Sequence, residues 1–485
     1  MPDTHPADAA LAAVAAFLAG IIGADLGWSA AACAGAALAA ATAALIRPRA
    51  WKLHVLFFAA FAAGVIYCGA FYAIADAQRN LPLNRGTAFS ALIADEPVLT
   101  SKGSFLYTAD AAPPFRGSFL FLAPPAGPEA EFAYGDLVTI SGTLEASREP
   151  HAPPIMFSPA VGLVAQHKGF FFRDWMLGIK AAAIREFRGA LPADEAGLLG
   201  GIMFGYRAGI PPDLRNELSR AGAAHIIAVS GYQIMILVAV CGAFFKKFLP
   251  RRASLAATAA LIVLFISMTG WRASAVRAAI MGVVALAARA IGEAPNLRNL
   301  IAFTAAAMVL ADPSAPVFNV GFILSFVGLL GIIFLGPPIR GLLRAGGPAP
   351  AHAPFGLRDA AAIVLSAQIA VMPILIRAFG PLSLVGVFAN VLVTATIPAT
   401  MALGTMLAVF GFASGRLAFF AAQCAGFFLR YQLLVIRTFA ALAVPVPFSF
   451  DSAFFIASYY LLLALFVFSR RSSLRAAGVP ASLPP

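Results

Sequence analysis

The stretch AHIIAVSGYQIMILVAVCGAFF, from Ala224 to Phe245, decides the fold class. It is apolar over a length that suits a membrane-spanning helix, which needs about 20 such residues. Yet it carries a histidine, and a Ser-Gly pair that weakens a helix, near its middle. In lipid, every backbone polar group must be satisfied within the protein. The stretch therefore indicates either close helix packing through small residues or a helix broken where it lines a wet path.

The composition extends this interpretation to the whole chain. Of its 485 residues, 61% are hydrophobic and only 12% are charged, against about 25% charged in ordinary globular proteins. Several further apolar runs reach the length of a membrane span. These values exclude a soluble globular fold and predict an α-helical polytopic membrane protein.

The net charge of +12 has two interpretations. In a soluble protein it would indicate a nucleic-acid partner. In a membrane protein the same excess is expected, because cytoplasmic loops collect Lys and Arg. The basic segments RPRAWKLH (Arg47 to His54) and KKFLPRR (Lys246 to Arg252) are therefore expected on the cytoplasmic side.

The first part of the chain is divided into a membrane segment and a polar insertion. Spans are expected near 9–24, 29–46 and 55–75, within an N-terminal segment of residues 1–75. Residues 76–168 are polar, with short β-branched and aromatic runs between turns, which is typical of a small all-β domain. We expect an extracytoplasmic barrel of five strands, of the OB type.

The aromatic residues of this β domain have two possible roles. A domain that binds single strands needs stacking rings on a positive surface, but acids outnumber bases between residues 76 and 168. Alternation along the strands also places several rings in the core, so both roles stay open. The available rings are Phe105, Tyr107, Phe119, Phe121 and Tyr134.

The remainder of the chain returns to the membrane. Residues 169–222 are expected to form amphipathic interfacial helices, because DWMLGIKAAAIREFRGAL keeps its apolar residues on one face. Residues 223–470 form the main membrane domain, and residues 471–485 a short polar tail. Spans are expected near 226–245, 254–270, 274–291, 299–311, 318–336, 359–378, 381–399, 400–415, 417–440 and 453–469. Counted through these spans, the basic segment RRSSLR falls on the outer side, against the loop-charge rule. Either one expected span is re-entrant or the number of spans is wrong, and the pair 381–399 and 400–415 is the weakest place.

Basic residues inside the expected spans point to a site. Arginine in the membrane interior costs about 2.5 kcal/mol or more and usually faces a cavity or a partner. Arg272 precedes, and Arg277 lies inside, the run that ends near Ile291. Guanidinium groups beside a cavity suit an anionic passenger, because their planar fork binds phosphate. Phospholipid head groups are the alternative partner for the shallower arginines.

Three motifs follow one another in the membrane domain. They are LPADEAGLLGGIMFGYRAGIPPDLRNELSRAGAAHIIAVSGYQI (Leu191 to Ile234), WRASAVRAAIM (Trp271 to Met281) and ADPSAPVFNVGFILSFVGLLG (Ala311 to Gly331). In this order they resemble the ComEC family, the inner-membrane channel proteins of bacterial DNA uptake. The resemblance covers nearly the whole chain. It implies a channel that passes one strand of incoming DNA into the cytoplasm during natural transformation.

The resemblance also implies candidate residues along the DNA path. Three polar positions depart from the family pattern. Gln233 stands where a second histidine is usual, and Asn319 and Ile323 stand where Asp and Gln are usual. These departures leave open a divergent channel or a member whose transport has changed. The candidates are His225, Ser230, Gly231, Gln233, Arg272, Ser274, Arg277, Asn319, Gly321, Phe322 and Ser325.

The expected partners follow from the same resemblance. They are single-stranded DNA, membrane lipids, a DNA receptor on the outer side and a cytoplasmic helicase-like translocase, at a bacterial inner (plasma) membrane. The chain has no G-x-x-x-x-G-K-[ST] loop. Many family members carry a C-terminal metallo-β-lactamase-like domain, which we expect this chain to lack, because its six histidines form no H-x-H-x-D-H cluster. We therefore expect no enzymatic activity, no metal and no cofactor.

Two other classes of function stay open. A permease for a small-molecule or lipid-linked substrate would use the same scaffold. An intramembrane hydrolase would pair Ser230 with His225, but five residues along a helix place them about 140° apart around its axis. No acid lies nearby to orient the histidine, so the sequence disfavours the hydrolase.

Overall fold

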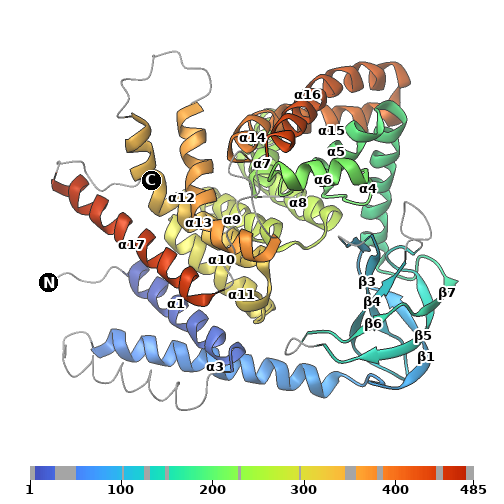
Figure 1. The fold of residues 1–485 in the computed structure, drawn as a ribbon, viewed down its shortest axis with the longest axis horizontal. Helices are drawn as coiled ribbons and strands as arrows, with labels where there is room; N and C mark the ends of the chain where they lie inside the picture. Colours follow the sequence, from blue (N-terminus) through green and yellow to red (C-terminus); the bar gives the residue numbers. More distant parts are fainter. Residues whose placement is uncertain are drawn as a thin grey trace. The chain divides into compact units, whose positions relative to one another are not determined.

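The computed structural model describes residues 6–27, 51–100, 103–124, 132–147, 152–227, 231–293, 296–344, 357–379, 386–443 and 452–476. Helices dominate the chain, and one small barrel of strands follows the helices α1 (Pro6–Asp25) and α3 (Trp51–Gln78) (Figure 1). The chain forms two compact units. The first comprises Met1–Arg185, Tyr206–Gly209 and Leu237–Phe318, and the second comprises Glu186–Gly205, Ile210–Ile236 and Asn319–Pro485.

The apolar helices confirm a polytopic membrane protein. Within the described residues, six helices are long and apolar enough to cross a membrane, or up to seven if a bent pair counts as one span. The bent pair is α14 (Gly386–Thr394) and α15 (Ile397–Ala413), with an angle of 44° between them. The six are α3 (Trp51–Gln78), α8 (Arg251–Thr269), α9 (Ala273–Ala290), α12 (Val320–Arg344), α13 (Leu357–Phe379) and α16 (Gly415–Ala441).

Several expected spans are shorter in the structure. In the run expected from residue 226, turns occupy residues 224–227, and the described helix is α7 (Gly231–Phe248). A four-residue helix, α11 (Ala315–Phe318), precedes α12. Shorter apolar stretches lie within α1 (Pro6–Asp25), α10 (Leu297–Ala311) and α17 (Ala453–Ala476).

Helices α1 and α3 approach each other through glycine. A Cβ atom on Gly20 would lie 2.1 Å from the carbonyl oxygen of Phe61, and one on Gly64 would lie 2.2 Å from that of Phe17. Only glycine permits this distance, as in many membrane helix pairs. The pair also buries Asp25, whose Oδ1 accepts hydrogen bonds from Cys68 Sγ at 3.2 Å and from Tyr72 OH at 3.0 Å.

The β domain is a closed barrel, which confirms the OB-like prediction. Seven strands form one sheet, and β5 pairs back onto β1 to close it. β4 and β6 are parallel, and the other pairs are antiparallel. The closed path runs through β1 (Gly86–Ile93), β3 (Phe105–Ala111), β4 (Ser118–Ala123), β6 (Ile155–Phe157) and β5 (Leu137–Glu145), with β2 (Val98–Leu99) beside β3 and β7 (Ala160–Ala165) beside β5.

The barrel interior is aromatic. Phe105, Tyr107, Phe119 and Phe121 are all no more than 2% exposed. The rings of Tyr107 and Phe121 stack with their centroids 4.7 Å apart. Alternate residues of a strand point to the same face, so these four rings belong to the core. They are therefore not surface platforms for nucleic-acid bases.

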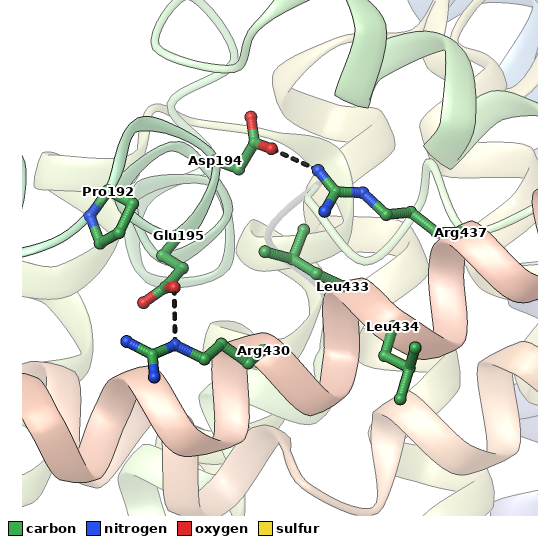
Figure 2. Close-up of a pocket in the computed structure, with 7 residues that line it drawn as sticks. All are labelled: Pro192, Asp194, Glu195, Arg430, Leu433, Leu434 and Arg437. Atoms are coloured by element: carbon green, nitrogen blue, oxygen red, sulfur yellow. Dashed lines mark hydrogen bonds and ion pairs between the residues drawn. The ribbon is translucent and has the colours of Figure 1, made fainter.

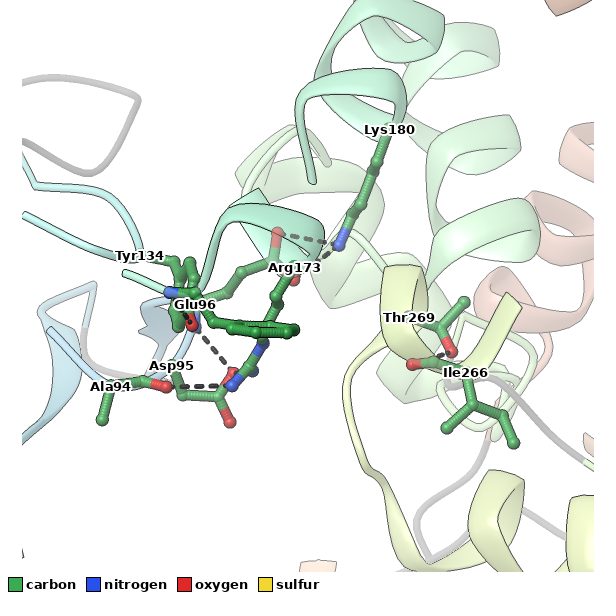
Figure 3. Close-up of polar contacts among 9 residues, drawn as sticks. Ala94, Asp95, Glu96, Tyr134, Arg173, Lys180, Ile266 and Thr269 are labelled. Atoms are coloured by element: carbon green, nitrogen blue, oxygen red, sulfur yellow. Dashed lines mark hydrogen bonds and ion pairs between the residues drawn. The ribbon is translucent and has the colours of Figure 1, made fainter. Parts of the chain in front are cut away.

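Helix α4 (Phe171–Ala190) holds the barrel through two ion pairs (Figure 3). Lys180 Nζ lies 2.7 Å from Glu96 Oε2, and the lysine side chain is only 5% exposed. Arg173 pairs with Asp95 and donates to the carbonyl of Ala94 at 3.0 Å. The guanidinium of Arg173 also lies 4.4 Å from the ring centroid of Tyr134. Tyr134, the remaining aromatic residue considered for base stacking, is thus already in contact with a cation of the same chain.

Candidate functional site

The two arginines expected along the DNA path lie at the start of α9. Arg272 is the residue before the helix, with extended backbone, and Arg277 lies one turn inside it; both are half-buried. Burial and the nearby Arg207 lower the pKa of Arg272, whereas Glu96 and Asp95 act in the opposite direction. An arginine stays protonated in proteins, so the start of α9 carries two positive charges. Ser274 lies on the same turn.

The histidine and glutamine of the first motif flank the start of α7. His225 lies in a turn, where burial lowers the pKa of its imidazole and a hydrogen bond with the backbone of Gly222 acts in the opposite direction. Gly231 is the first residue of α7. Ser230 lies outside the described residues, so its expected role stays a prediction. Gln233 is 1% exposed, and its Nε2 donates to the carbonyl of Ile202 at 2.9 Å.

The carbonyl of Ile202 lies in α5 (Ala193–Phe204), so the hydrogen bond from Gln233 connects α7 to a neighbouring helix.

The third motif begins α12 with an N-cap. Asn319 precedes the helix, and its Oδ1 accepts the backbone N–H of Phe322 at 3.0 Å. Phe322 is buried and packs on Phe326, with ring centroids 4.5 Å apart. Gly321 is exposed and Ser325 is half-buried on the same turns.

The candidates therefore fall on both compact units. Arg272, Ser274 and Arg277 belong to the first unit, and the structure brings them together on the first turns of α9. The others belong to the second unit, where they form two groups, one around the start of α7 and one at the start of α12. The second-unit candidates in the described residues are His225, Gly231, Gln233, Asn319, Gly321, Phe322 and Ser325.

A third charged group, on α16, was missed by the sequence analysis. Arg430 Nε lies 3.0 Å from Glu195 Oε1, and Arg437 pairs with Asp194 (Figure 2). Arg437 Nε also lies 3.2 Å from Glu217 Oε2, in α6 (Pro212–Arg220). A cavity of about 410 Å³ opens between these residues. Arg430 and Arg437 are seven positions apart within the span expected at 417–440. This heptad spacing places both arginines on one face of the helix, and it was the signal that could have identified them as a group.

A polar cluster also lies where α14 meets α15. Gln432 of α16 is fully buried, and its Nε2 donates to Thr396 Oγ1 at 2.9 Å and to Thr400 Oγ1 at 2.8 Å. Thr396 lies in the break itself. The expected irregularity at 381–399 and 400–415 thus corresponds to a real bend, held by side chains of a neighbouring helix.

The sequence model of the competence protein family matches residues 202–472. The chain belongs to this family. The match confirms the resemblance to ComEC. ComE operon protein 3 of Bacillus subtilis (strain 168) is 24% identical over 256 residues, which are 51% of this chain and 31% of that relative. The match therefore leaves out most of the relative's length. No solved structure matches the chain.

Two of the residues that depart from the family pattern, Asn319 and Gln233, have structural roles in this competence-family chain. Asparagine and aspartate are both favoured N-caps, so Asn319 performs the capping that an aspartate would perform. Gln233 donates one hydrogen bond to a helix carbonyl, as a histidine could. The altered positions are therefore compatible with an intact fold. Ile323 lies on the first turn of α12 and is half-buried.

The titratable groups of this family member offer no metal centre in the part of the chain that the structure describes. There, no group of three or more His, Cys, Asp or Glu residues could hold a metal ion. The expected absence of a metal and of a cofactor stays a prediction for the chain as a whole.

Proposed function

We propose that this competence-family chain forms the channel through which one strand of incoming DNA crosses the bacterial inner membrane. The strand would pass along a hydrated, cation-bearing surface, and its phosphates would be attracted without readout of its bases. The β-barrel would face outward and meet the strand first. In this proposal the chain is not an enzyme and acts as a conduit only.

The observation that carries the proposal is the presence of arginines inside helices long enough to span a membrane. Arg277 lies in α9, and Arg430 lies near the middle of α16 beside the open cavity. The side chain of Arg430 is 64% exposed and Arg437 is 48% exposed. Arginine against lipid is costly, so the exposed parts of Arg430 and Arg437 would be solvated by water and could also contact a passing anion.

The energy for transport would come from outside the chain. We propose a cytoplasmic helicase-like translocase that pulls the strand, or the membrane potential, and a DNA receptor that delivers DNA from the outer side. The acids paired with Arg430 and Arg437 would keep these guanidinium groups in place while no phosphate is bound. A phosphate would then compete with them for the same N–H donors.

The test is uptake of fluorescent DNA by a deletion strain that carries this chain alone or a variant of it. Arg277→Ala should sharply reduce uptake while the protein still reaches the membrane. Arg377→Ala, in the last turn of α13 with an exposed side chain, is the matched control and should keep uptake. Uptake at the wild-type level in Arg277→Ala would remove α9 from the path. Unchanged uptake in the deletion strain itself would favour a permease for another substrate.

A further inference from the structure

The end of the α7–α8–α9 bundle concentrates positive charge. Lys246 and Lys247 lie in the last turn of α7, and Arg251 and Arg252 begin α8. Arg289 lies in the last turn of α9. Arg251 Nη2 donates to the carbonyl of Arg289 at 2.6 Å, which joins the two helix ends. We call these five residues the basic end.

In the part of the chain that the structure describes, the cations of the basic end have no acidic partners. All five side chains are exposed, and none forms an ion pair within the described residues. The sequence from Leu237 to Glu293 contains a single acid, Glu293 itself. In the same unit Lys180, by contrast, pairs with Glu96. Within the described residues the basic end has no counter-charge of its own, and an anion from outside the chain would supply one.

Helix stability does not explain all of these cations. Positive charge is favourable at a helix C-terminus and unfavourable at an N-terminus. Lys246, Lys247 and Arg289 lie at C-termini and fit this rule. Arg251 and Arg252 lie at the N-terminus of α8 and oppose it. The hydrogen bond from Arg251 to the last turn of α9 accounts for Arg251. Arg252 has no such bond among the described residues and is better explained by a ligand.

An apolar stripe on α7 leads directly to the basic end. Val240, Phe244 and Phe248 follow one another at intervals of four residues, and are 56%, 58% and 70% exposed. The rings of Phe244 and Phe248 lie 5.1 Å apart. Side chains four apart lie on one face of a helix. Membrane proteins place such stripes against lipid tails, with aromatic and basic residues at the level of the head groups.

We propose that the basic end binds the phosphate groups of anionic phospholipids, with phosphatidylglycerol as the probe. Clusters of cations next to a membrane span attract anionic head groups. The stripe favours a bilayer over a nucleic acid, because the phenylalanines that reach the cations would lie in lipid. This site does not depend on the proposed passage of DNA.

The experiment measures lipid retention by the purified full-length chain with native mass spectrometry. The chain is titrated with phosphatidylglycerol or phosphatidylcholine in mixed micelles. The test variant is Lys246→Gln/Lys247→Gln/Arg252→Gln, which keeps Arg251 and its hydrogen bond to α9. The control Arg85→Gln/Arg116→Gln/Lys168→Gln removes the same charge from exposed positions of the β domain. Unfolding temperatures in phosphatidylcholine verify that both variants fold.

We expect wild type and control to prefer phosphatidylglycerol. One cation near an anionic surface changes affinity about fivefold, so the test variant should lose roughly tenfold or more of this preference. An unchanged preference in the folded test variant would overturn the proposal. Inorganic phosphate and a single-stranded oligonucleotide serve as competitors. If free phosphate displaces the lipid completely at equal concentration, or the oligonucleotide does so at a lower concentration, the lipid assignment is wrong.

Discussion

Replacing Gln432 by methionine is expected to change the stability of the membrane domain very little, although it removes a buried polar side chain. Both threonine hydroxyls near Gln432 donate to backbone carbonyls, Thr396 to Val393 at 2.8 Å and Thr400 to Thr396 at 3.1 Å. Their oxygens must therefore accept from Gln432, which fixes its Nε2 toward them. The Oε1 atom is then buried without a hydrogen-bond partner among the described residues.

Opposing terms of similar size produce this result. Losing the two hydrogen bonds from Nε2 costs about 1 kcal/mol each, or about 0.6 kcal/mol each by the average for membrane helices. Removing an unsatisfied buried acceptor returns about 1–3 kcal/mol. Methionine is flexible enough to fill the irregular space that the amide leaves. The expected net change in the free energy of unfolding is therefore within about 1 kcal/mol of zero.

Thermal or denaturant unfolding of the purified chain in detergent measures this change. Thr400→Val is the matched control, because it removes one partner while leaving an amide N–H of Gln432 unsatisfied, and it should cost about 1–3 kcal/mol. A loss larger than about 3 kcal/mol in Gln432→Met would refute the reasoning. It would mean that Oε1 has a partner of its own, such as a bound water or ion, at the bend between α14 and α15.

Three other perturbations have defined outcomes. Glu96→Gln should destabilise the contact between the barrel and α4 by about 3 kcal/mol, because it leaves a buried lysine unpaired, and added Lys180→Met should restore resistance to limited proteolysis. Gly64→Ala should lower the unfolding temperature, because its Cβ would overlap a carbonyl oxygen, whereas Gly69→Ala, with nothing within 4 Å, should not. The lowered pKa of His225 means that the unfolded chain binds its proton more readily, so stability should fall as the pH drops below about 6.5. A pH titration of unfolding that is identical in His225→Gln would contradict this assignment.

The fold class followed from features that act over short distances. The length of the apolar runs gives membrane helices, and the alternation in FLYTADA and SFLFLA gives the strands whose rings fill the barrel. Local chemistry was sufficient in both cases. The cap at Asn319 was not predicted, although asparagine is a common residue at the start of a helix.

The charged cluster on α16 required contacts between distant parts of the chain. Arg437 meets Asp194 across 243 positions, and Arg430 meets Glu195 across 235. No periodicity specifies such a pairing, although the heptad spacing of the two arginines marks one helix face. Gln233 was singled out because it stands where the family usually has a histidine, but its partner at Ile202 could not be inferred from spacing. The sequence therefore identified single polar residues better than it identified their partners.

The loop that carries Asp95 and Glu96 has a consequence for what the β domain can recognise. In OB domains the connection after the first strand is one of the two loops that surround a bound oligonucleotide. Here both carboxylates of that connection are engaged by cations of α4. A strand arriving at this rim would therefore meet carboxylates whose charge is already neutralised by α4. In the proposed channel, this loop would neither repel the phosphates of the strand nor offer them a free cation of its own.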